Sequence, residues 1–426
     1  MVIDENLGEI SGLLKIDKGP QIKFGQLILK GSDKFNKKLI EYAIDFESNN
    51  LYDQSLIDNI PNRLSQFSFL KLQRDVSYEI YNNKCDVYLY LQNKSANSFD
   101  AILGILPKQD GGVNITGDVK LNLVNQFKSG EEVRFNWRKL LPLTQSLDIS
   151  LKLPYFLKSK VSLEPKFDLY KKDTSFLNLN AALGIGYRLN KHLDVVLKYT
   201  FQGTNLIPNA SLENATRLPN ILDANVNYYG ASILFNNSDF PSNPRKGWDI
   251  RLSGDFGFKA ISKNILFADS LYADINLRSN QVATTIHVER FLSIGKRNVF
   301  APRFQGAAMV SDNLLQNELF RLGGLRNALG FDDESIFAST YGIATMEYRF
   351  LLNRDSRIFA FGQYIYTESM TINSATDFDR PRSFGAGVNY ATNSGVFSII
   401  YAIGAQRDNP LLIRSAKIHL GFVNYF

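Results

Sequence analysis

The stretch FRLGGLRNALGFDDESIFASTYGIATMEYRF, from Phe320 to Phe350, decides the fold class of this chain. A glycine-rich segment leads directly into a long segment in which apolar and polar residues alternate. Successive side chains of a strand point to opposite faces, so Met346, Tyr348 and Phe350 share one face while Glu347 and Arg349 share the other. Two charges on one face of an otherwise apolar strand predict a barrel with a wet interior.

The composition of the 426 residues favours strands and excludes several classes of protein. Hydrophobic residues make up 44% of the chain and aromatic residues 12%, which argues against disorder and suits strands. The net charge of +6 is spread without a Lys/Arg block, so we expect no nucleic-acid partner. The longest apolar runs are too short for a transmembrane helix. The single cysteine, Cys85, allows no intrachain disulfide and is interpreted as a small strand residue.

Residues 20–95 mix helical and strand patterns and predict a small α+β module. Apolar residues recur at helical spacing over 36–45 and again over 54–69, where Pro61 is expected to kink or break the second helix. A strand over 21–31 precedes the helices. Two alternating strands, LKLQRDVSYEIY and CDVYLYLQN, follow them around the turn Asn82-Asn83. The expected order is β-α-α-β-β.

From residue 97 to 426 the pattern is all strand, and we count about sixteen strands. About 20 residues per strand and connection leave room for the about 9–11 residues of a tilted membrane strand. Soluble sandwiches also alternate, but these strands are longer than the usual ones of globular sheets. Their connections alternate between short turns and long loops, which is typical of outer-membrane barrels. The short set is KSGE, RLNKH, SIGKR, NRDS and TNSG, and the long set is 205–224, 259–278, 311–336 and 370–381.

The C-terminus, KIHLGFVNYF, is similar to the signal by which outer-membrane barrels are recognised for insertion. His419 and Gly421 match its polar and glycine positions, and Tyr425 and Phe426 supply the aromatic end. Asn424 departs from the pattern, because a hydrophobic residue is expected there.

Taken together, the chain resembles the BamA/TamA-type outer-membrane assembly superfamily. The resemblance implies a polypeptide-transport-associated (POTRA) module at 20–95 and a sixteen-stranded transmembrane barrel at 97–426. Residues 1–19 then read as a linker or the end of a preceding POTRA module. The segment after Met1 lacks the features of a signal peptide, so we expect a C-terminal part of a longer protein, with a short N-terminal extension as the alternative.

The most specific part of the resemblance is the sixth loop, which in this family folds into the lumen and carries L-G-G followed by V-R-G-F/Y. On the strand count, the loop 311–336 lies between strands eleven and twelve, which is the position of the family's sixth loop. Gly323, Gly324, Gly330 and Phe331 match, but Leu329 stands where the family has its arginine. That arginine meets acidic groups on the lumen wall of strands twelve and thirteen. The lumen-wall positions here are Glu347, Arg349 and Gln363, and Gln363 stands where an aspartate is expected. Either Arg326 substitutes for the missing arginine or this lock is lost.

The resemblance implies a non-catalytic assembly, insertion or translocation factor of a Gram-negative outer membrane, with the POTRA module in the periplasm. Clients would add strands to the module and to a lateral seam between the first and last barrel strands, where we place Leu103, Gly104 and Gly421. The alternatives are an accessory barrel paralogue or a passive channel. A hydrolase domain N-terminal to residue 1 is a further option, because some family members carry one.

The expected partners are outer-membrane lipids, unfolded outer-membrane or secreted clients, and other assembly subunits that bind the module. No catalytic motif occurs in the sequence, and we expect no cofactor and no metal. The acidic run 332–334 is interpreted as a solvated loop.

Overall fold

A computed structural model of the chain describes residues 2–4, 9–11, 19–31, 35–65, 67–107, 113–141, 143–190, 192–208, 212, 216–240, 243–324, 327–372, 374–392, 395–407 and 411–425. The contacts divide it into two units, Met1–Lys94 and Ser95–Phe426, which are described separately. Within the described residues, no helix is long and apolar enough to cross a membrane.

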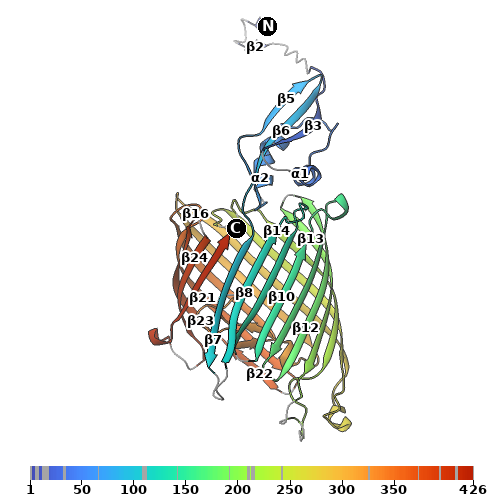
Figure 1. Cartoon of the computed structure of the whole chain (residues 1–426), viewed down its shortest axis with the longest axis vertical. Helices are drawn as coiled ribbons and strands as arrows, with labels where there is room; N and C mark the ends of the chain where they lie inside the picture. Colours follow the sequence, from blue (N-terminus) through green and yellow to red (C-terminus); the bar gives the residue numbers. More distant parts are fainter. Residues whose placement is uncertain are drawn as a thin grey trace. The chain divides into compact units, whose positions relative to one another are not determined.

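The N-terminal unit is an α+β fold in which the long strand β6 is central (Figure 1). β6 pairs in parallel with β3, and on its other side it pairs antiparallel with β4 and β5. A separate two-stranded sheet, β1 with β2, precedes this fold. The elements are β1 (Val2–Asp4), β2 (Glu9–Ser11), β3 (Lys23–Lys30), α1 (Lys37–Ile44), α2 (Gln54–Leu64), β4 (Leu70–Leu72), β5 (Ser77–Tyr81) and β6 (Lys84–Asn93).

Side-chain caps fix where the two helices begin. The Asn36 side chain accepts hydrogen bonds from the main-chain N–H groups of Lys38 and Leu39 at the start of α1. At the start of α2 the Asp53 carboxylate accepts a hydrogen bond from the Ser55 main-chain N–H at 2.8 Å. Hydrogen bonds from the Ser55 side chain and main chain hold the pKa of Asp53 below its usual value. α2 continues through Pro61 and ends at Leu64, so the predicted helix over 54–69 was too long.

One face of the N-terminal sheet forms the core with the helices. Cys85, Val87, Leu89 and Leu91 alternate along β6 and are all fully buried. Burial raises the pKa of the Cys85 thiol. The strand predicted over 70–81 is interrupted at 73–76, so it forms β4 and β5 instead of one continuous strand.

The C-terminal unit is a closed antiparallel β-barrel, whose tilted strands follow one another around the wall in chain order (Figure 1). β22 and β23 both pair with β21 on either side of Arg380 and Pro381, so together they make one strand and the barrel has sixteen. The strands are β7 (Ser98–Pro107), β8 (Val113–Val124), β9 (Glu132–Leu141), β10 (Thr144–Lys152), β11 (Val161–Lys172), β12 (Phe176–Asn190), β13 (Leu193–Leu206), β14 (Ala224–Asn236), β15 (Gly247–Ile261), β16 (Arg278–Ile294), β17 (Asn298–Ser311), β20 (Thr340–Leu351), β21 (Arg357–Thr371), β22 (Ser374–Asp379), β23 (Arg382–Thr392), β24 (Gly395–Ala405) and β25 (Lys417–Tyr425).

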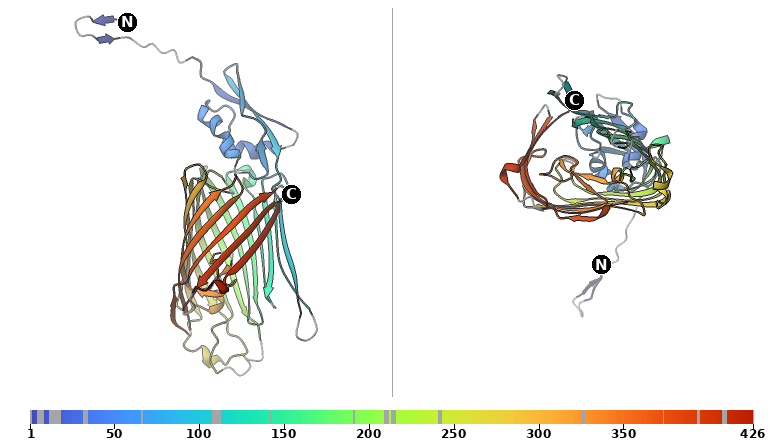
Figure 2. Two further views of the ribbon diagram at one scale, coloured as in Figure 1. Left: turned by 90° about the vertical axis from the view of Figure 1, so that its left-hand side faces the viewer. Right: turned by 90° about the horizontal axis from the view of Figure 1, so that it is seen from below.

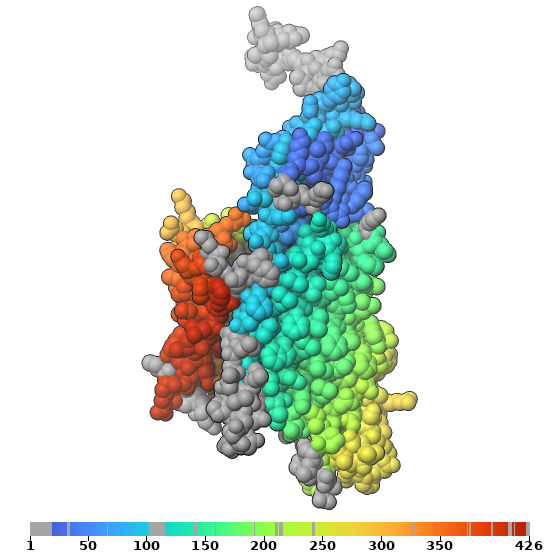
Figure 3. Space-filling view, viewed as in Figure 1, coloured from blue at the N-terminus to red at the C-terminus, as the bar shows by residue number. Residues whose placement is uncertain are grey.

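The alternation that the sequence predicts is present in the wall. On β20, Thr345, Glu347 and Arg349 are buried inside the barrel, while Met346 and Tyr348 are about half exposed on the outside. On the side shown in Figure 3, consecutive strands coloured from teal to yellow-green form a continuous outer surface. Large apolar side chains recur on it, for example Ile185, Leu197, Tyr229, Phe258, Ile286, Phe304, Ile358, Tyr364, Phe384, Ile399 and Leu420. An outer surface with this many exposed large apolar side chains is typical of a lipid-facing barrel wall.

The long loops all lie at one rim of the barrel, as predicted, although this rim also has the short connections 142–143 and 173–175. The long loops are 207–223, 262–277, 312–339 and 406–416, and the turns between β12 and β13, β16 and β17, and β20 and β21 lie at the other rim. One prediction was wrong in detail. The segment 370–381, expected to be a long loop, extends β21 to Thr371 and returns as β22.

Candidate functional site

The loop between β17 and β20, which we call loop six, folds against the inside of the barrel wall. It lies between the eleventh and twelfth strands and contains a short hairpin made of β18 (Phe320–Leu322) and β19 (Ile336–Ala338). Its Ala328 and Phe331 are buried in one apolar cluster with Ile343 of β20 and Ile365 of β21. The candidate site consists of this loop and the part of the wall that holds it, together with the junction of the first and last strands, which is described below.

Gln363, on β21, holds the tip of loop six. Its side-chain oxygen accepts a hydrogen bond from the Leu329 main-chain N–H at 2.9 Å, and its amide donates to the Asn327 carbonyl at 3.1 Å. The Gln363 side-chain amide also donates to the Thr345 hydroxyl, and the Ser383 hydroxyl donates to the Gln363 side-chain oxygen, each at 3.1 Å. A carboxylate at this position could not donate to a carbonyl, so a neutral amide suits a loop that presents main chain in place of an arginine.

Glycines shape loop six because other main-chain groups come too close for a side chain. Gly323 has φ +129° and Gly324 has φ +71°, and a Cβ on Gly323 would lie 1.9 Å from the Asp332 carbonyl oxygen. The Gly324 N–H donates to the Phe331 carbonyl at 3.2 Å. Gly330 has φ +88°, and its Cβ would lie 2.9 Å from the main chain of Gly404 on β24. These positions favour glycine on conformational and on steric grounds.

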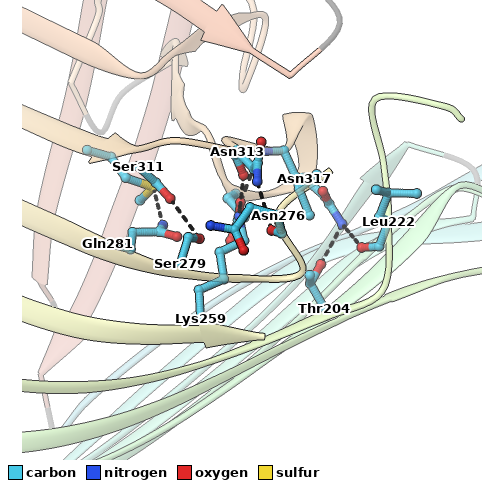
Figure 4. A network of polar contacts seen from close by, with 12 residues as sticks. Thr204, Leu222, Lys259, Asn276, Ser279, Gln281, Ser311, Asn313 and Asn317 are labelled. Carbon is cyan, nitrogen blue, oxygen red and sulfur yellow. Dashed lines mark hydrogen bonds and ion pairs between the residues drawn. The ribbon is translucent and has the colours of Figure 1, made fainter. Parts of the chain in front are cut away.

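A second anchor holds the first part of loop six, and Figure 4 shows it. The Lys259 ammonium on β15 forms an ion pair with the Glu318 carboxylate and donates to the Asn313 carbonyl at 2.7 Å. Both charged side chains are fully buried. Nearby, the Asn317 amide donates to Thr204 on β13 at 2.6 Å and to the Leu222 carbonyl at 3.2 Å.

Sequence reasoning missed this anchor. Lys259 continues the inward face of β15 that Asp249, Arg251 and Asp255 already occupy, so its direction follows from the alternation. Its partner Glu318 lies 59 residues later, in a single 3-10 turn (Gln316–Glu318) within loop six. No spacing rule connects two such residues.

Wall charges near the short-turn rim pair with one another. The Arg349 guanidinium donates to Glu347 at 2.6 Å and to Glu289 on β16 at 2.8 Å, and Arg357 Nε lies 4.0 Å from Glu347. All of these groups belong to barrel strands. Glu347 occupies the position at which the family's lock has an acidic group, and its ion-pair partners among the described residues are Arg349 and Arg357 of the wall. Arg326, the proposed substitute, lies outside the described residues.

The junction of the last and first strands is the weakest pairing in the wall. β25 and β7 share two register pairs, Asn424 with Phe99 and Tyr425 with Ser98, whereas β7 shares ten with β8 and β24 shares eight with β25. Figure 2 shows β7 and β25 separating away from this end. Most of the facing edges of the two strands therefore lack a strand partner in the described wall. We call this junction the seam.

The predicted seam and signal residues occupy these two strands. Leu103 and Gly104 lie in β7, where they pair with β8 only, and Gly421 on β25 pairs with Ser398 of β24. His419 lies on the same strand as Gly421, Tyr425 ends it, and Phe426 lies outside the described residues. Leu103 and Gly421 do not face each other as a register pair, because the observed pairing is confined to 98–99 and 424–425.

The comparisons with known proteins agree with this architecture. The sequence profile of the Omp85 superfamily domain matches residues 125–421. CdiB from Acinetobacter baumannii has a similar structure, with a TM-score of 0.60 and 12% identity over 95% of this chain and 73% of that one. CdiB from Escherichia coli gives 0.55 and 11%, covering 98% and 93%. BamA from Haemophilus ducreyi lacking POTRA domains 1–3 gives 0.53 and 14%, covering 96% and 86%. No curated protein sequence matches the chain.

Proposed function

The chain belongs to the Omp85 superfamily as a divergent outer-membrane β-barrel member of the BamA/TamA type, and from this premise we propose that it assembles, inserts or translocates client proteins at the outer membrane. The mechanism is non-catalytic and uses no cofactor. Its steps are strand addition to the N-terminal unit and lateral opening of the barrel at the seam. The N-terminal unit acts as a POTRA domain in the periplasm of a Gram-negative bacterium.

The observation that carries the proposal is the seam. A strand edge inside a bilayer leaves N–H and C=O groups without partners, and each such group costs several kcal/mol in hydrocarbon. β7 and β25 share two register pairs, so most of their facing edges are available to a client strand. A client hairpin that pairs with either edge satisfies its own main chain before it meets lipid.

The N-terminal unit offers a second edge, on β5. Asn82 and Asn83 form a two-residue turn with positive φ, and Tyr81 pairs with Lys84 across it. In this register the N–H of Ile80 points away from β6, where it can bond an extended client. Tyr78, Ile80 and Tyr81 are exposed beside this edge. Main-chain bonds of this kind ignore client sequence, which suits a factor with many clients.

A second candidate, an accessory barrel that inserts nothing, is favoured by one observation. Leu329 replaces the arginine of the family motif, and neutral hydrogen bonds to Gln363 hold the loop in its place. A passive channel has less support, because loop six packs against the lumen wall and lumen cations such as Lys152 and Lys166 are paired with carboxylates.

We expect the full chain, reconstituted in liposomes, to accelerate the folding of an outer-membrane barrel client diluted from urea. The initial rate, read from the heat-modifiable gel shift of the client, should rise about tenfold over empty liposomes, because a template removes part of the cost of burying unpaired main chain. Ile80→Pro should reduce the acceleration severalfold, since proline removes the outward N–H of the β5 edge.

Ile80→Ala is the matched control, because it trims the side chain and keeps the N–H donor. Equal losses in both variants would refute strand addition at β5. If the unmodified chain does not accelerate client folding, the accessory-barrel candidate is supported. If it also gives a steady high conductance in planar bilayers, it is a channel.

A further inference from the structure

The acidic run of loop six contacts the wall on both sides of the seam. The Asp332 carboxylate lies 2.7 Å from the Lys417 ammonium on β25, the last strand. The Asp333 carboxylate accepts a hydrogen bond at 2.5 Å from the guanidinium of Arg138 on β9, the third strand. The seam between β25 and β7 lies between these two contacts. Asp332 is solvent-exposed, as expected for this run, whereas the Asp333 side chain is only 29% exposed, so the expectation of a solvated run was wrong for Asp333.

Close main-chain packing in loop six fixes the positions of Asp332 and Asp333. The Asp332 carbonyl and the Asp333 carboxylate pack against Gly323 and Gly324, where any Cβ would collide with them. Immediately before them, the ring of Phe331 packs on Gly404 of β24, where a Cβ would come within 2.9 Å of it. Loop six is thus held to the β21–β24 side of the wall independently of the acidic run.

The two ion pairs differ in their exposure to water. The Arg138 side chain is 12% exposed and also lies 3.6 Å from Asp118 on β8, and the Asp333 side chain is 29% exposed. The Lys417 and Asp332 side chains are 38% and 74% exposed. The contact to the β9 side is therefore less screened than the contact to the β25 side, and neither is fully buried.

We propose that Asp332 and Asp333 form a clasp that holds the seam in its resting position. Adjacent residues of loop six bind cations from the two ends of the wall, so separating β25 from β7 to β9 breaks at least one of the two pairs. The seam has only two register pairs in the described wall, and the two ion pairs of the clasp add attraction across the lumen between its two sides. This inference rests on the proposed function only in naming the seam as the place of opening.

The test measures the seam itself. Nitroxide labels at Ala101→Cys on β7 and Leu420→Cys on β25, both exposed outward positions, report the distance between the strands by pulsed electron resonance. Cys85 is fully buried and is replaced by alanine in every variant. The double change Asp332→Asn with Asp333→Asn should raise the ratio of open to closed seam about tenfold in lipid nanodiscs, and added salt should have a similar but weaker effect.

Asp148→Asn is the matched control, because Asp148 forms a 3.0 Å lumen ion pair with Lys166 on strands away from the seam. Lys417→Asp alone should open the seam, and adding Asp332→Lys should close it again by restoring opposite charges. An unchanged distance distribution in the double asparagine variant, or no rescue by the exchange, would overturn the clasp. Seam widening without any change in client folding would keep the clasp and overturn the proposed function.

Discussion

Replacing Lys259 with methionine is expected to lower the free energy of unfolding of the barrel by about 3–5 kcal/mol, the usual cost of leaving a buried charge without its partner. The Glu318 carboxylate would remain fully buried and, among the described residues, would keep the Leu315 main-chain N–H, at 2.9 Å, as its hydrogen-bond donor. The measurement is urea-induced unfolding in lipid vesicles followed by tryptophan fluorescence. Both tryptophans, Trp137 and Trp248, lie on barrel strands, so the signal excludes the N-terminal unit.

Two further variants make this prediction specific to the buried pair. The double change Lys259→Met with Glu318→Leu removes both charges and should recover most of the loss. Lys166→Met removes one partner of a 3.0 Å pair whose side chains are 51% and 30% exposed, and should cost less than about 1 kcal/mol. If Lys259→Met and Lys166→Met shift the unfolding midpoint equally, the buried pair is not an anchor of loop six.

Replacing Gly330 with alanine is expected to weaken the docking of loop six by about 3 kcal/mol. Gly330 has φ +88°, and the new Cβ would lie 2.9 Å from the main chain of Ile403 and Gly404, so strain and collision add. The readout is maleimide labelling of Ala328→Cys, which is fully buried while the loop is docked. The undocked fraction, and with it the labelling rate, should rise roughly a hundredfold.

Gly295→Ala is the control for a glycine-to-alanine change at positive φ outside loop six. Gly295 has φ +70° in a turn of the short-turn rim, and a Cβ there would have no heavy atom within 4 Å. Gly295→Ala should therefore leave the labelling of Ala328→Cys unchanged. If Gly330→Ala also leaves it unchanged, the contact with β24 does not hold the loop.

Much of the fold follows from patterns that the sequence displays directly. Alternation predicts that Glu347 and Arg349 face inward while Met346 faces lipid, because a strand has a fixed period of two. Counting strands places loop six between the eleventh and twelfth, as the barrel has it. Helical spacing over 36–45 locates α1 within a residue of its observed bounds at each end.

The partners across the lumen could not be predicted in the same way. Alternation assigns Lys259 and Arg138 to the inside of the wall, but it does not say which segment of a long loop reaches them. Glu318 and Asp333 lie 59 and 195 residues away along the chain from these partners. Only closure of the barrel brings them together. The interruption of the strand at 73–76 and the hairpin at 370–381 likewise depend on tertiary pairing and not on local pattern.

In the proposed mechanism clients enter through the seam, and a disulfide across the seam tests this entry. Phe99→Cys and Asn424→Cys replace a register pair of β7 and β25 in the Cys85→Ala background. Tyr199→Cys and Tyr229→Cys, a register pair of β13 and β14 on the outer face, form the control crosslink. Oxidation of the seam pair should reduce client folding severalfold, because β7 and β25 can no longer separate at the end where they pair. Reduction should restore the rate, and the control crosslink should have no effect. Full client folding by the oxidised seam variant would contradict the account.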